Sequence, residues 1–306
     1  MPGRLRVWSA LLIASLGWGS AGIATRAALR EGLEPYQIAA MRAVLAAFVV
    51  AAVLVASGRG IAGRRRWTIG LVLGSANMAV PFVLTALAVQ HASAGFVGLL
   101  VANIPIATAL WAHVVLPDDR LTAAKAAGLA VSVGGIVVLM AGGDSGIGEG
   151  GDPLLAVALA SAGLLAASYG AVHVKRFAPD LGALELAGPQ FAVGAAIMIP
   201  LMLVMTGMPE GTAAGWWLIA YLGTVGTVMP FVLFYWALRE VTATEASLVG
   251  YIVPIVGLIG GAVVLGERIS AVIAAGGALI LCGVVLTERA SRRAVQPAPS
   301  AAADHG

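Results

Sequence analysis

Long apolar stretches alternate along the chain with short breaks that hold charged or turn-forming residues. A helix needs roughly 20 mainly apolar residues to cross the hydrocarbon core of a bilayer. No stretch alternates apolar and polar residues with a period of two, as the strands of a membrane barrel would. The pattern therefore predicts an all-α fold with ten membrane-spanning helices, at residues 7–25, 35–56, 68–89, 92–115, 122–141, 154–174, 182–206, 215–237, 243–265 and 270–288.

The composition indicates where these helices reside. Of the 306 residues, 60% are hydrophobic and only 11% are charged, and the mean hydropathy is +0.96. A soluble domain is about 45–50% apolar and about 25% charged. The excess of apolar surface predicts an integral membrane protein whose main partner is the lipid bilayer. A fold held by disulfides within the chain is excluded, because Cys282 is the one cysteine.

The distribution of basic residues predicts the orientation. With the N-terminus inside, the cytoplasmic segments and adjoining helix ends hold Arg4, Arg6, Arg59, Arg64, Arg65, Arg66, Arg120, Lys125, Lys175, Arg176, Arg239, Arg289, Arg292 and Arg293. The external segments hold Arg26, Arg30 and Arg268, and Arg42 lies within a span. Basic residues concentrate on the cytoplasmic side of membrane proteins. We therefore expect a multi-pass protein of a bacterial-type inner (plasma) membrane, with both termini cytoplasmic. The dispersed charge does not favour a nucleic-acid partner.

The two ends of the chain lead to separate expectations. The start, "MPGRLRVWSALLIASLGWGS", resembles a secretory signal, but its apolar run is long for one. We expect it to remain as the first span. The end, "SRRAVQPAPSAAADHG", is polar and rich in Pro and Ala, so residues 290–306 are predicted to be a disordered cytoplasmic tail.

An internal repeat divides the chain. The tetrapeptide "PFVL" occurs at residues 81–84 and again, 149 residues later, at 230–233. The shift also pairs Pro105 with Pro254. Five helices per half is an odd number, so the second half enters the membrane from the opposite face, as in transporters that work by alternating access. We expect two inverted five-helix repeats around a central cavity, at residues 1–141 and 154–289, joined by an external loop at 142–153.

The paired prolines predict bending points. A proline inside a helix removes one backbone hydrogen bond and disturbs the preceding turn. Neighbouring helices or waters can satisfy the freed carbonyl within a bundle. Pro81, Pro105, Pro230 and Pro254 are therefore candidate hinges. Ordinary enrichment of proline in membrane helices is the alternative for each one alone.

Several segments resemble a known family. They are "GWGS" (17–20), "EPYQIAAMRAVLAAF" (34–48), the two PFVL helices, and "VVLGERIS" (263–270) before the last span. These segments resemble the EamA-like branch of the drug/metabolite transporter superfamily. The resemblance implies a ten-helix basket around a central cavity that exports amino acids or related metabolites. The first half departs from the pattern, with "LPDDRL" at 116–121 where "LGERL" is expected.

Polar and aromatic residues near the middle of the spans are the candidate substrate contacts. Amides can hold an ammonium or carboxylate without a buried charge, and Tyr and Trp offer apolar walls with a polar tip. Arg42 either reaches the surface or faces the outer cavity and attracts carboxylates. A helix–helix packing role stays open for each residue. The candidates are Trp18, Arg42, Asn77, Pro81, Asn103, Tyr169, Gln190, Tyr221, Tyr235 and Tyr251.

Other chemistry lacks support in the sequence. "GIGEGG" (146–151) fits a dinucleotide-binding pattern, but no strand precedes it and acidic residues surround it. No ATP-binding loop is present, and the histidines lack metal-ligand spacing, so we expect no cofactor and no metal. No carboxylate lies near the middle of a span, which favours weak or no proton coupling.

The favoured function is export of small zwitterionic or apolar metabolites, most of all amino acids, including aromatic ones. The alternatives are a membrane-embedded enzyme acting on lipid or isoprenoid substrates, a sugar-nucleotide or drug transporter, and a scaffold that transports nothing. Gly70 with Gly74 and Gly257 with Gly261 form small-xxx-small pairs. We expect these pairs to pack helices within one chain, which would act as a monomer.

Overall fold

A computed structural model describes residues 2–58, 60, 62–116, 121–147, 150–240 and 249–295. Side chains are described for these residues except 2–4, 238–239, 249–250 and 291–295. All regular structure in the described ranges is helical. Predictions that fall on residues 59, 117–120, 148–149, 241–248 and 296–306 lie outside the described residues.

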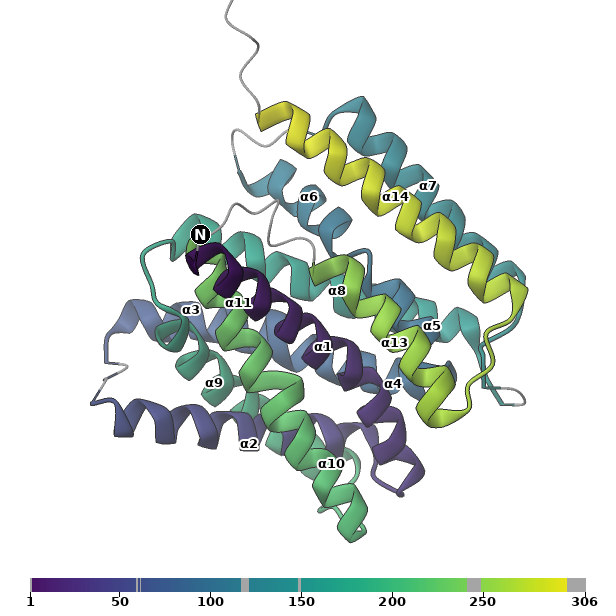
Figure 1. The fold of residues 1–306 in the computed structure, drawn as a ribbon. Coiled ribbons are helices and arrows are strands. Elements are labelled where there is room, and N and C mark those ends of the chain that lie inside the picture. The colour runs from purple at the N-terminus through teal and green to yellow at the C-terminus, as the bar shows by residue number, and fades with distance from the viewer. Residues whose placement is uncertain are drawn as a thin grey trace, which may run out of the picture.

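The first half contains five apolar segments (Figure 1). The third is a helix interrupted by a π-helical turn, and the fourth is broken into two helices. In chain order the elements are α1 (Pro2–Arg30), α2 (Pro35–Ala56), α3 (Arg64–Gly74), η1 (Ser75–Ala79), α4 (Val80–His91), α5 (Ala94–Val101), α6 (Ile104–Val115) and α7 (Ala123–Ala141).

The second half repeats this order, again with a π-helical turn in its third segment. Its elements are α8 (Pro153–Phe177), α9 (Ala183–Met205), α10 (Ala213–Gly223), η2 (Thr224–Val228), α11 (Met229–Glu240), α13 (Val249–Leu265) and α14 (Ala271–Val295). Nine helical segments of the described chain are long and apolar enough to cross a membrane. The shorter apolar helix Tyr251–Leu265 takes the place of the ninth predicted span.

Two predicted limits are wrong. The first span was expected to stop at residue 25, but α1 continues to Arg30, and Arg26 and Arg30 donate hydrogen bonds to carbonyls of neighbouring segments. The tail was expected from residue 290, but α14 continues to Val295. Ala and Arg are strong helix formers, so a helix can extend into water beyond the apolar run.

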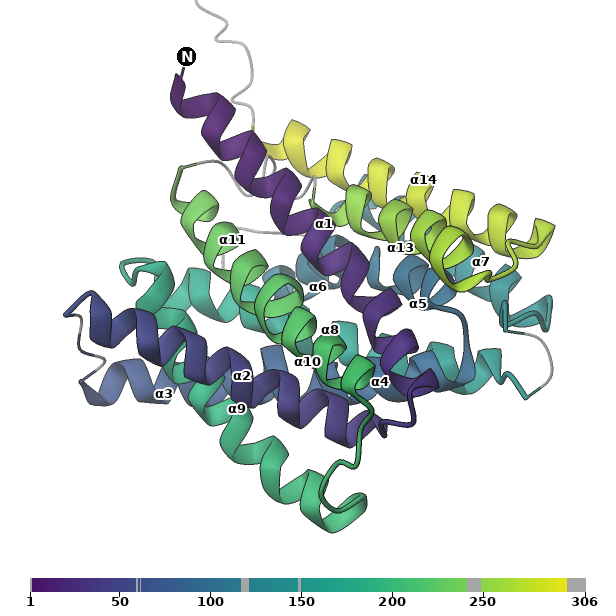
Figure 2. The same ribbon diagram turned by 60° about the horizontal axis from the view of Figure 1, so that its bottom comes forward.

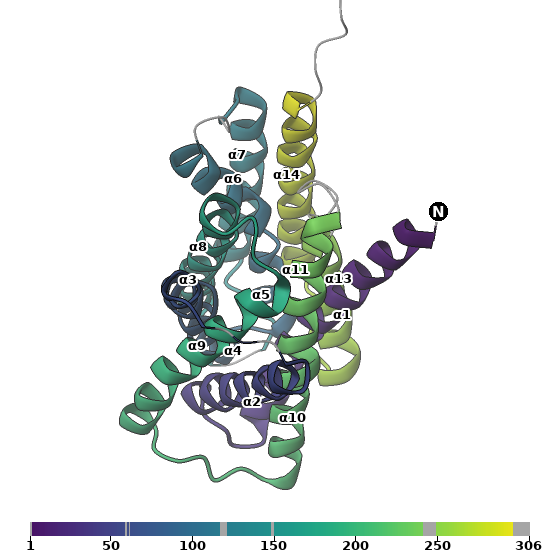
Figure 3. The same cartoon turned by 90° about the vertical axis from the view of Figure 1, so that its left-hand side faces the viewer.

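Helices of the two halves pack in symmetric, antiparallel pairs. Helix α7 lies along α14 at one side of the bundle (Figures 1 and 3), and α2 packs on α9. A Cβ added at Gly135 would lie 2.7 Å from the carbonyl oxygen of Gly276, and one at Gly283 would lie 2.5 Å from that of Gly128. From one contact to the other, the residue number falls along α7 (135 to 128) and rises along α14 (276 to 283), so the two helices run antiparallel. The fold is thus the predicted pair of inverted five-helix halves.

The repeated prolines follow π-helical turns that obey the same repeat. Turn η1 at Ser75–Ala79 and turn η2 at Thr224–Val228 are related by the shift of 149 residues, and Pro81 and Pro230 follow two residues after them. A π-turn bonds each N–H five residues back; such turns are rare and are frequently found at functional sites. The proline therefore follows the same π-helical turn in both halves.

The second proline pair is not accommodated symmetrically. Pro105 follows a break between α5 and α6, where the Asn103 amide nitrogen lies 3.1 Å from the carbonyl oxygen of Leu100. A side chain that bonds to nearby backbone in this way competes with the helix. Pro254 instead lies inside the continuous helix α13.

The small-residue pairs pack helices of the same chain. A Cβ on Gly70 would lie 2.3 Å from Cβ of Pro189, and one on Gly74 would lie 2.7 Å from Cβ of Val193, both on α9. A Cβ on Gly257 would lie 3.7 Å from the carbonyl oxygen of Gly19. The predicted packing within the chain is confirmed at these positions.

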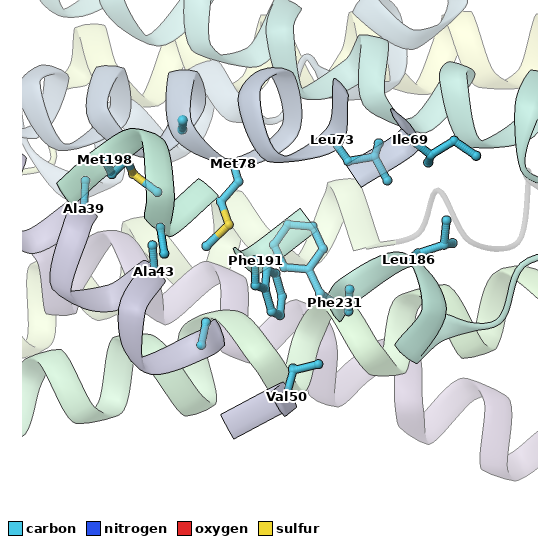
Figure 4. Packing of buried hydrophobic residues seen from close by; sticks show 14 of the residues in the cluster. Ala39, Ala43, Val50, Ile69, Leu73, Met78, Leu186, Phe191, Met198 and Phe231 are labelled. Atoms are coloured by element: carbon cyan, nitrogen blue, oxygen red, sulfur yellow. The ribbon is translucent and has the colours of Figure 1, made fainter. Parts of the chain in front are cut away.

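The largest apolar cluster fills the space between α2, α3, α4, α9 and α11, which also lie together in Figure 2. Phe191 of α9 and Phe231 of α11 lie side by side at its centre, with Met78 of η1 beside them (Figure 4). Both rings are buried, and their centroids are 5.6 Å apart at an interplanar angle of 79°. Buried aromatic pairs in this edge-to-face arrangement add to the free energy of packing. The core therefore joins the two halves.

Candidate functional site

A buried hydrogen-bonded chain joins three spans beside the aromatic cluster. The Asn77 amide nitrogen, in η1, lies 3.2 Å from the Tyr235 hydroxyl oxygen, and that hydroxyl donates to Oε1 of Gln190 at 2.8 Å. Tyr235 comes from α11 and Gln190 from α9, so the chain of bonds links the first half with the second. Three of the predicted candidates thus meet at one place.

The amide of Gln190 has unused hydrogen-bonding capacity. Its side chain is fully buried, and Nε2 has no hydrogen-bond partner among the described residues. A buried polar group left without a partner costs about 1–3 kcal/mol of stability. An unsatisfied buried group in a folded protein calls for an explanation, and a ligand that completes it is one.

An aromatic wall adjoins these amides. The ring of Trp18, on α1, lies 5.3 Å from that of Phe231 and also 5.3 Å from that of Phe234, with edge-on geometry in both pairs. Tyr235 follows Phe234 directly on α11. Trp18 and Tyr235, predicted separately, are therefore joined through two phenylalanines. The arrangement places a polar amide group next to a flat apolar surface.

Arg42 does not reach the membrane surface, which corrects one of the two expectations for it. Its side chain is buried, with Nε 2.5 Å from the Thr227 hydroxyl oxygen and Nη2 2.8 Å from the Gly226 carbonyl oxygen. The guanidinium carbon lies 3.8 Å from the centre of the Phe82 ring, a cation–π contact. The Thr227 hydroxyl donates in turn to the carbonyl of Leu222. Arg42 therefore binds the π-turn of the opposite half.

The repeat relates Arg42 to the aromatic core. A shift of 149 residues pairs Arg42 with Phe191 and Phe82 with Phe231. In the structure Arg42 contacts Phe82, as a cation over a ring. The repeat-related residues Phe191 and Phe231 also contact each other, as ring against ring. The two halves therefore keep one packing geometry but place a charge in one copy and a ring in the other. This asymmetry distinguishes the two sides of the centre.

Thr227, Phe231 and Tyr235 are spaced four residues apart and so share one face of their helix. The rise of a helix is about 1.5 Å per residue, so Thr227 and Tyr235 are separated by roughly 12 Å along the axis. The face therefore presents the Arg42 contact, an aromatic ring and the Asn77–Gln190 network in succession. We call this set the central polar-aromatic cluster: Trp18, Arg42, Asn77, Phe82, Gln190, Thr227, Phe231, Phe234 and Tyr235.

Four other candidates lie in separate contacts. Asn103 accepts a hydrogen bond from Ser132 of α7, and Tyr251 donates one to the carboxylate of Glu288 on α14. Both therefore serve contacts between neighbouring helices. Pro81, in contrast, follows Asn77 by one turn on the segment that carries the cluster.

The other two tyrosines also contact helix neighbours. Tyr169 packs edge-on against Trp111, with ring centres 5.1 Å apart. The hydroxyl of Tyr221 lies 2.6 Å from that of Ser20. None of the contacts found for these tyrosines in the described chain joins the central polar-aromatic cluster.

Sequence reasoning missed part of this site. Phe82 and Phe231 were noted as part of the repeated PFVL but not as site residues, and no sequence pattern indicated Thr227. Glu267 and Glu288 were not considered as buried carboxylates, although both are more than nine-tenths buried. Glu288 lies in the last turn of its span, Ala271–Ala290, and so is not near the middle. In the described ranges, no group of acidic, His or Cys residues has metal-site geometry.

Ion pairs connect α3 with the start of α9, at the end of the bundle that we expect to be cytoplasmic. Arg65 makes a two-pronged contact with Asp180, at 2.7 and 2.6 Å, and Arg66 pairs with Glu185. The hydrogen bond from Arg65 lowers the pKa of the Asp180 carboxyl to about 2. These pairs, of which Arg65–Asp180 is exposed and Arg66–Glu185 is partly buried, join the two halves away from the central polar-aromatic cluster.

Comparison with known proteins gives the same two-part division. The sequence profile of the EamA-like transporter family matches residues 6–141 and, a second time, residues 154–289. The probable terminal-alkyne amino-acid exporter of Streptantibioticus cattleyicolor is 30% identical over 292 residues, covering 92% of this chain and 93% of that protein. An uncharacterized inner membrane transporter of Escherichia coli K12 is 24% identical over 270 residues, covering 87% of this chain and 85% of its own.

A solved crystal structure has a similar fold. It is 22% identical in sequence, covers 94% of this chain and 99% of its own, and superposes with a TM-score of 0.66. The likeness extends over both halves. From the profile match over both halves and the relative at 30% identity, the chain belongs to the EamA-like transporter family.

Proposed function

We propose that this transporter exports small α-amino acids with apolar or aromatic side chains, by alternating access of its two halves. The observation that carries the proposal is the unpaired, buried amide of Gln190 in a network that joins both halves beside an aromatic wall. An amide N–H can donate to the carboxylate of a zwitterion, while Trp18 and Phe234 contact an apolar side chain. The relative named as an amino-acid exporter supports the same class.

The roles follow from position. Asn77, Gln190 and Tyr235 would bind the polar head of the substrate, and Trp18 would flank its side chain. Arg42 would draw the carboxylate toward the cluster from the π-turn side, in agreement with its charge and its burial. Pro81 and Pro230, placed after matching π-turns, would be the bending points. Asn103, Tyr169 and Tyr251 serve helix contacts and are not part of the proposed binding site.

We further propose transport without strong proton coupling, by a monomer that is not an enzyme. In the described residues, the buried carboxylates Glu267 and Glu288 lie near segment ends and not beside Gln190.

The domain limits at residues 141 and 154, and the cytoplasmic location of both termini, belong to the same proposal. Cys282 is the single cysteine, so a Cys282→Ser background with cysteines at Gly60 and Gly211 would report sidedness. If a thiol reagent added on one side of the membrane labelled both cysteines, the proposed orientation of the helices would be contradicted.

Counterflow in proteoliposomes tests the substrate class. The panel contains apolar, aromatic and charged amino acids together with a nucleotide sugar. We expect exchange of apolar and aromatic amino acids, lost in Gln190→Met and reduced in Trp18→Leu. Trp217→Leu is the matched control, because Trp217 is 78% exposed. Exchange of the nucleotide sugar alone, or equal losses in both Trp variants, would contradict the proposal.

A further inference from the structure

A cavity of about 280 Å³ lies at the end of the bundle where α1 ends. We call this the distal end, and it is the end that we expect to be external. The walls of the cavity come from the last turns of α1, from residues 146–147 and from the turn at 266–268 between α13 and α14. The cavity is separate from the central polar-aromatic cluster and shares no residue with it.

Three arginines line this cavity: Arg26, Arg30 and Arg268. They are the three basic residues that the charge distribution assigns to external segments. Basic residues on that side oppose the usual bias of membrane proteins. Two distant parts of the chain, residues 26–30 and residue 268, bring them to one place. Their convergence indicates a role for positive charge at this position.

The one carboxylate in the cavity is already engaged. Glu267 is buried, and its oxygens accept hydrogen bonds from the backbone N–H groups of Ala94 and Gly95, at 2.8 and 3.3 Å. These groups open helix α5, where a negative charge is favourable. Within the described ranges, no salt bridge within 4 Å joins Glu267 to the three arginines, although its charge acts favourably on Arg26. The cavity therefore keeps an excess of positive charge.

Two of the arginines are held in place and keep further donors. Arg26 donates from Nη1 to the Val89 carbonyl at 2.7 Å, and Arg30 donates to the Leu265 carbonyl at 3.0 Å. The Nε of Arg26 is buried without a hydrogen-bond partner in the described chain. A guanidinium fixed at one corner presents its other N–H groups in a fork that matches a carboxylate or phosphate.

We propose that this cavity binds a small oxyanion, namely the carboxylate of the exported metabolite at the distal mouth of the transport path. The inference rests on the proposed function for the identity of the metabolite, but not for the binding of an oxyanion. The phosphate of an anionic lipid headgroup has the same chemistry, so the test separates the two sources.

The experiment uses the purified full chain in detergent, titrated with acetate, with acetamide as the uncharged analogue, and with dihexanoyl phosphatidylglycerol. Chloride keeps the ionic strength constant, and binding is measured by calorimetry and by the rise in Tm. We expect acetate to bind and acetamide not to bind. Arg30→Ala/Arg268→Ala should weaken acetate binding at least tenfold, because a bidentate contact to a charged group is lost.

Arg64→Ala is the matched control, since Arg64 is exposed and does not line the cavity. Arg30→Lys/Arg268→Lys keeps the charge but removes the fork, and should give an intermediate affinity. Equal acetate affinity in wild type and Arg30→Ala/Arg268→Ala would overturn the site. So would an equal loss in Arg64→Ala, or binding of the lipid but not of acetate through the same arginines.

Binding and transport are measured separately, so the two proposals can fail separately. Loss of acetate binding in Arg30→Ala/Arg268→Ala, together with failed amino-acid counterflow in wild type, would support the site and contradict the proposed substrates. Unfolding of the double variant would appear as a lower Tm without ligand. In that case Arg268→Ala alone, at an exposed side chain, supplies the comparison and must still weaken acetate binding.

Discussion

The Nη2 atom of Arg42 lies 2.8 Å from the carbonyl oxygen of Gly226. In a regular helix this oxygen would accept the N–H of residue 230, four residues later, but that residue is proline and has no N–H. Arg42 of the first half therefore replaces the donor that Pro230 removes from the second half. A cation in the membrane interior and a helix-breaking proline are each costly, and here they compensate for one another.

The first prediction concerns this compensation. Arg42→Met should lower the free energy of unfolding by about 1.5–3 kcal/mol, the usual value of a hydrogen bond to a charged group. In a Pro230→Ala background the loss should be smaller, because alanine supplies the missing N–H. A double-mutant cycle by chemical unfolding in detergent measures the difference. Additive effects of the two substitutions would show that Arg42 and Pro230 are independent.

The second prediction separates stability from transport at Gln190. Gln190→Met removes a buried amide whose Nε2 has no partner in the described chain. The substitution also removes Oε1, which accepts a hydrogen bond from the Tyr235 hydroxyl. Relief of the unpaired Nε2 opposes this loss, so we expect Tm to stay within a few degrees of wild type, while counterflow falls at least tenfold. Residues of functional sites often support activity at a cost in stability. A variant with low Tm and proportionally low transport would assign Gln190 to the fold alone.

The third prediction assigns Asn103 to structure. Its side chain accepts from Ser132 and lies 3.1 Å from the Leu100 carbonyl, so it closes the break before α6. Asn103→Ala should cost about 1–3 kcal/mol of unfolding free energy, because buried groups lose their partner. The KM for counterflow should be unchanged. A higher KM with normal Tm would place Asn103 in the binding site after all.

The fourth prediction uses two neighbouring glycines of α7. A Cβ at Gly135 would lie 2.7 Å from the Gly276 carbonyl oxygen and 2.8 Å from the Ile280 nitrogen, both backbone atoms of α14. One at Gly134 would meet nothing within 4 Å. Gly135→Ala should therefore lower Tm, by forcing the helices apart. Gly134→Ala should leave Tm unchanged or raise it, because alanine is favoured over glycine by up to about 1 kcal/mol. Equal Tm values would contradict the observed α7–α14 packing.

The fifth prediction concerns pH. Arg65 lowers the pKa of Asp180 in the folded chain to about 2, below the value near 3.9 of a free aspartate. A depressed carboxyl pKa contributes stability that is present above the unfolded pKa and is lost as pH falls through the folded pKa. The Tm difference between wild type and Asp180→Asn should be constant from pH 7 to about 5 and then vanish toward pH 2. High salt should reduce it, because the pair is exposed. A difference that persists at pH 2 would exclude this carboxylate as its source.

The sequence by itself determined the membrane class, the positions of the spans and the inverted repeat. Each of these depends on local hydrophobicity or on identical letters at a constant shift, which a single chain displays directly. The PFVL copies also predicted where both halves would be interrupted. The ends of α1 and α14 were missed, because their basic residues remain helical through partners or propensity that hydropathy does not measure.

Only the tertiary structure decided which candidates belong together. Asn77, Gln190 and Tyr235 meet, while Asn103 and Tyr251 bind neighbouring helices elsewhere. The contact of Arg42 with Gly226 spans 184 residues, and the three distal arginines gather from two separate segments. Such pairings depend on helix rotation and crossing, which side-chain packing across the whole bundle sets. A helix pattern shows which residues share a face, but not which face of another helix they will meet.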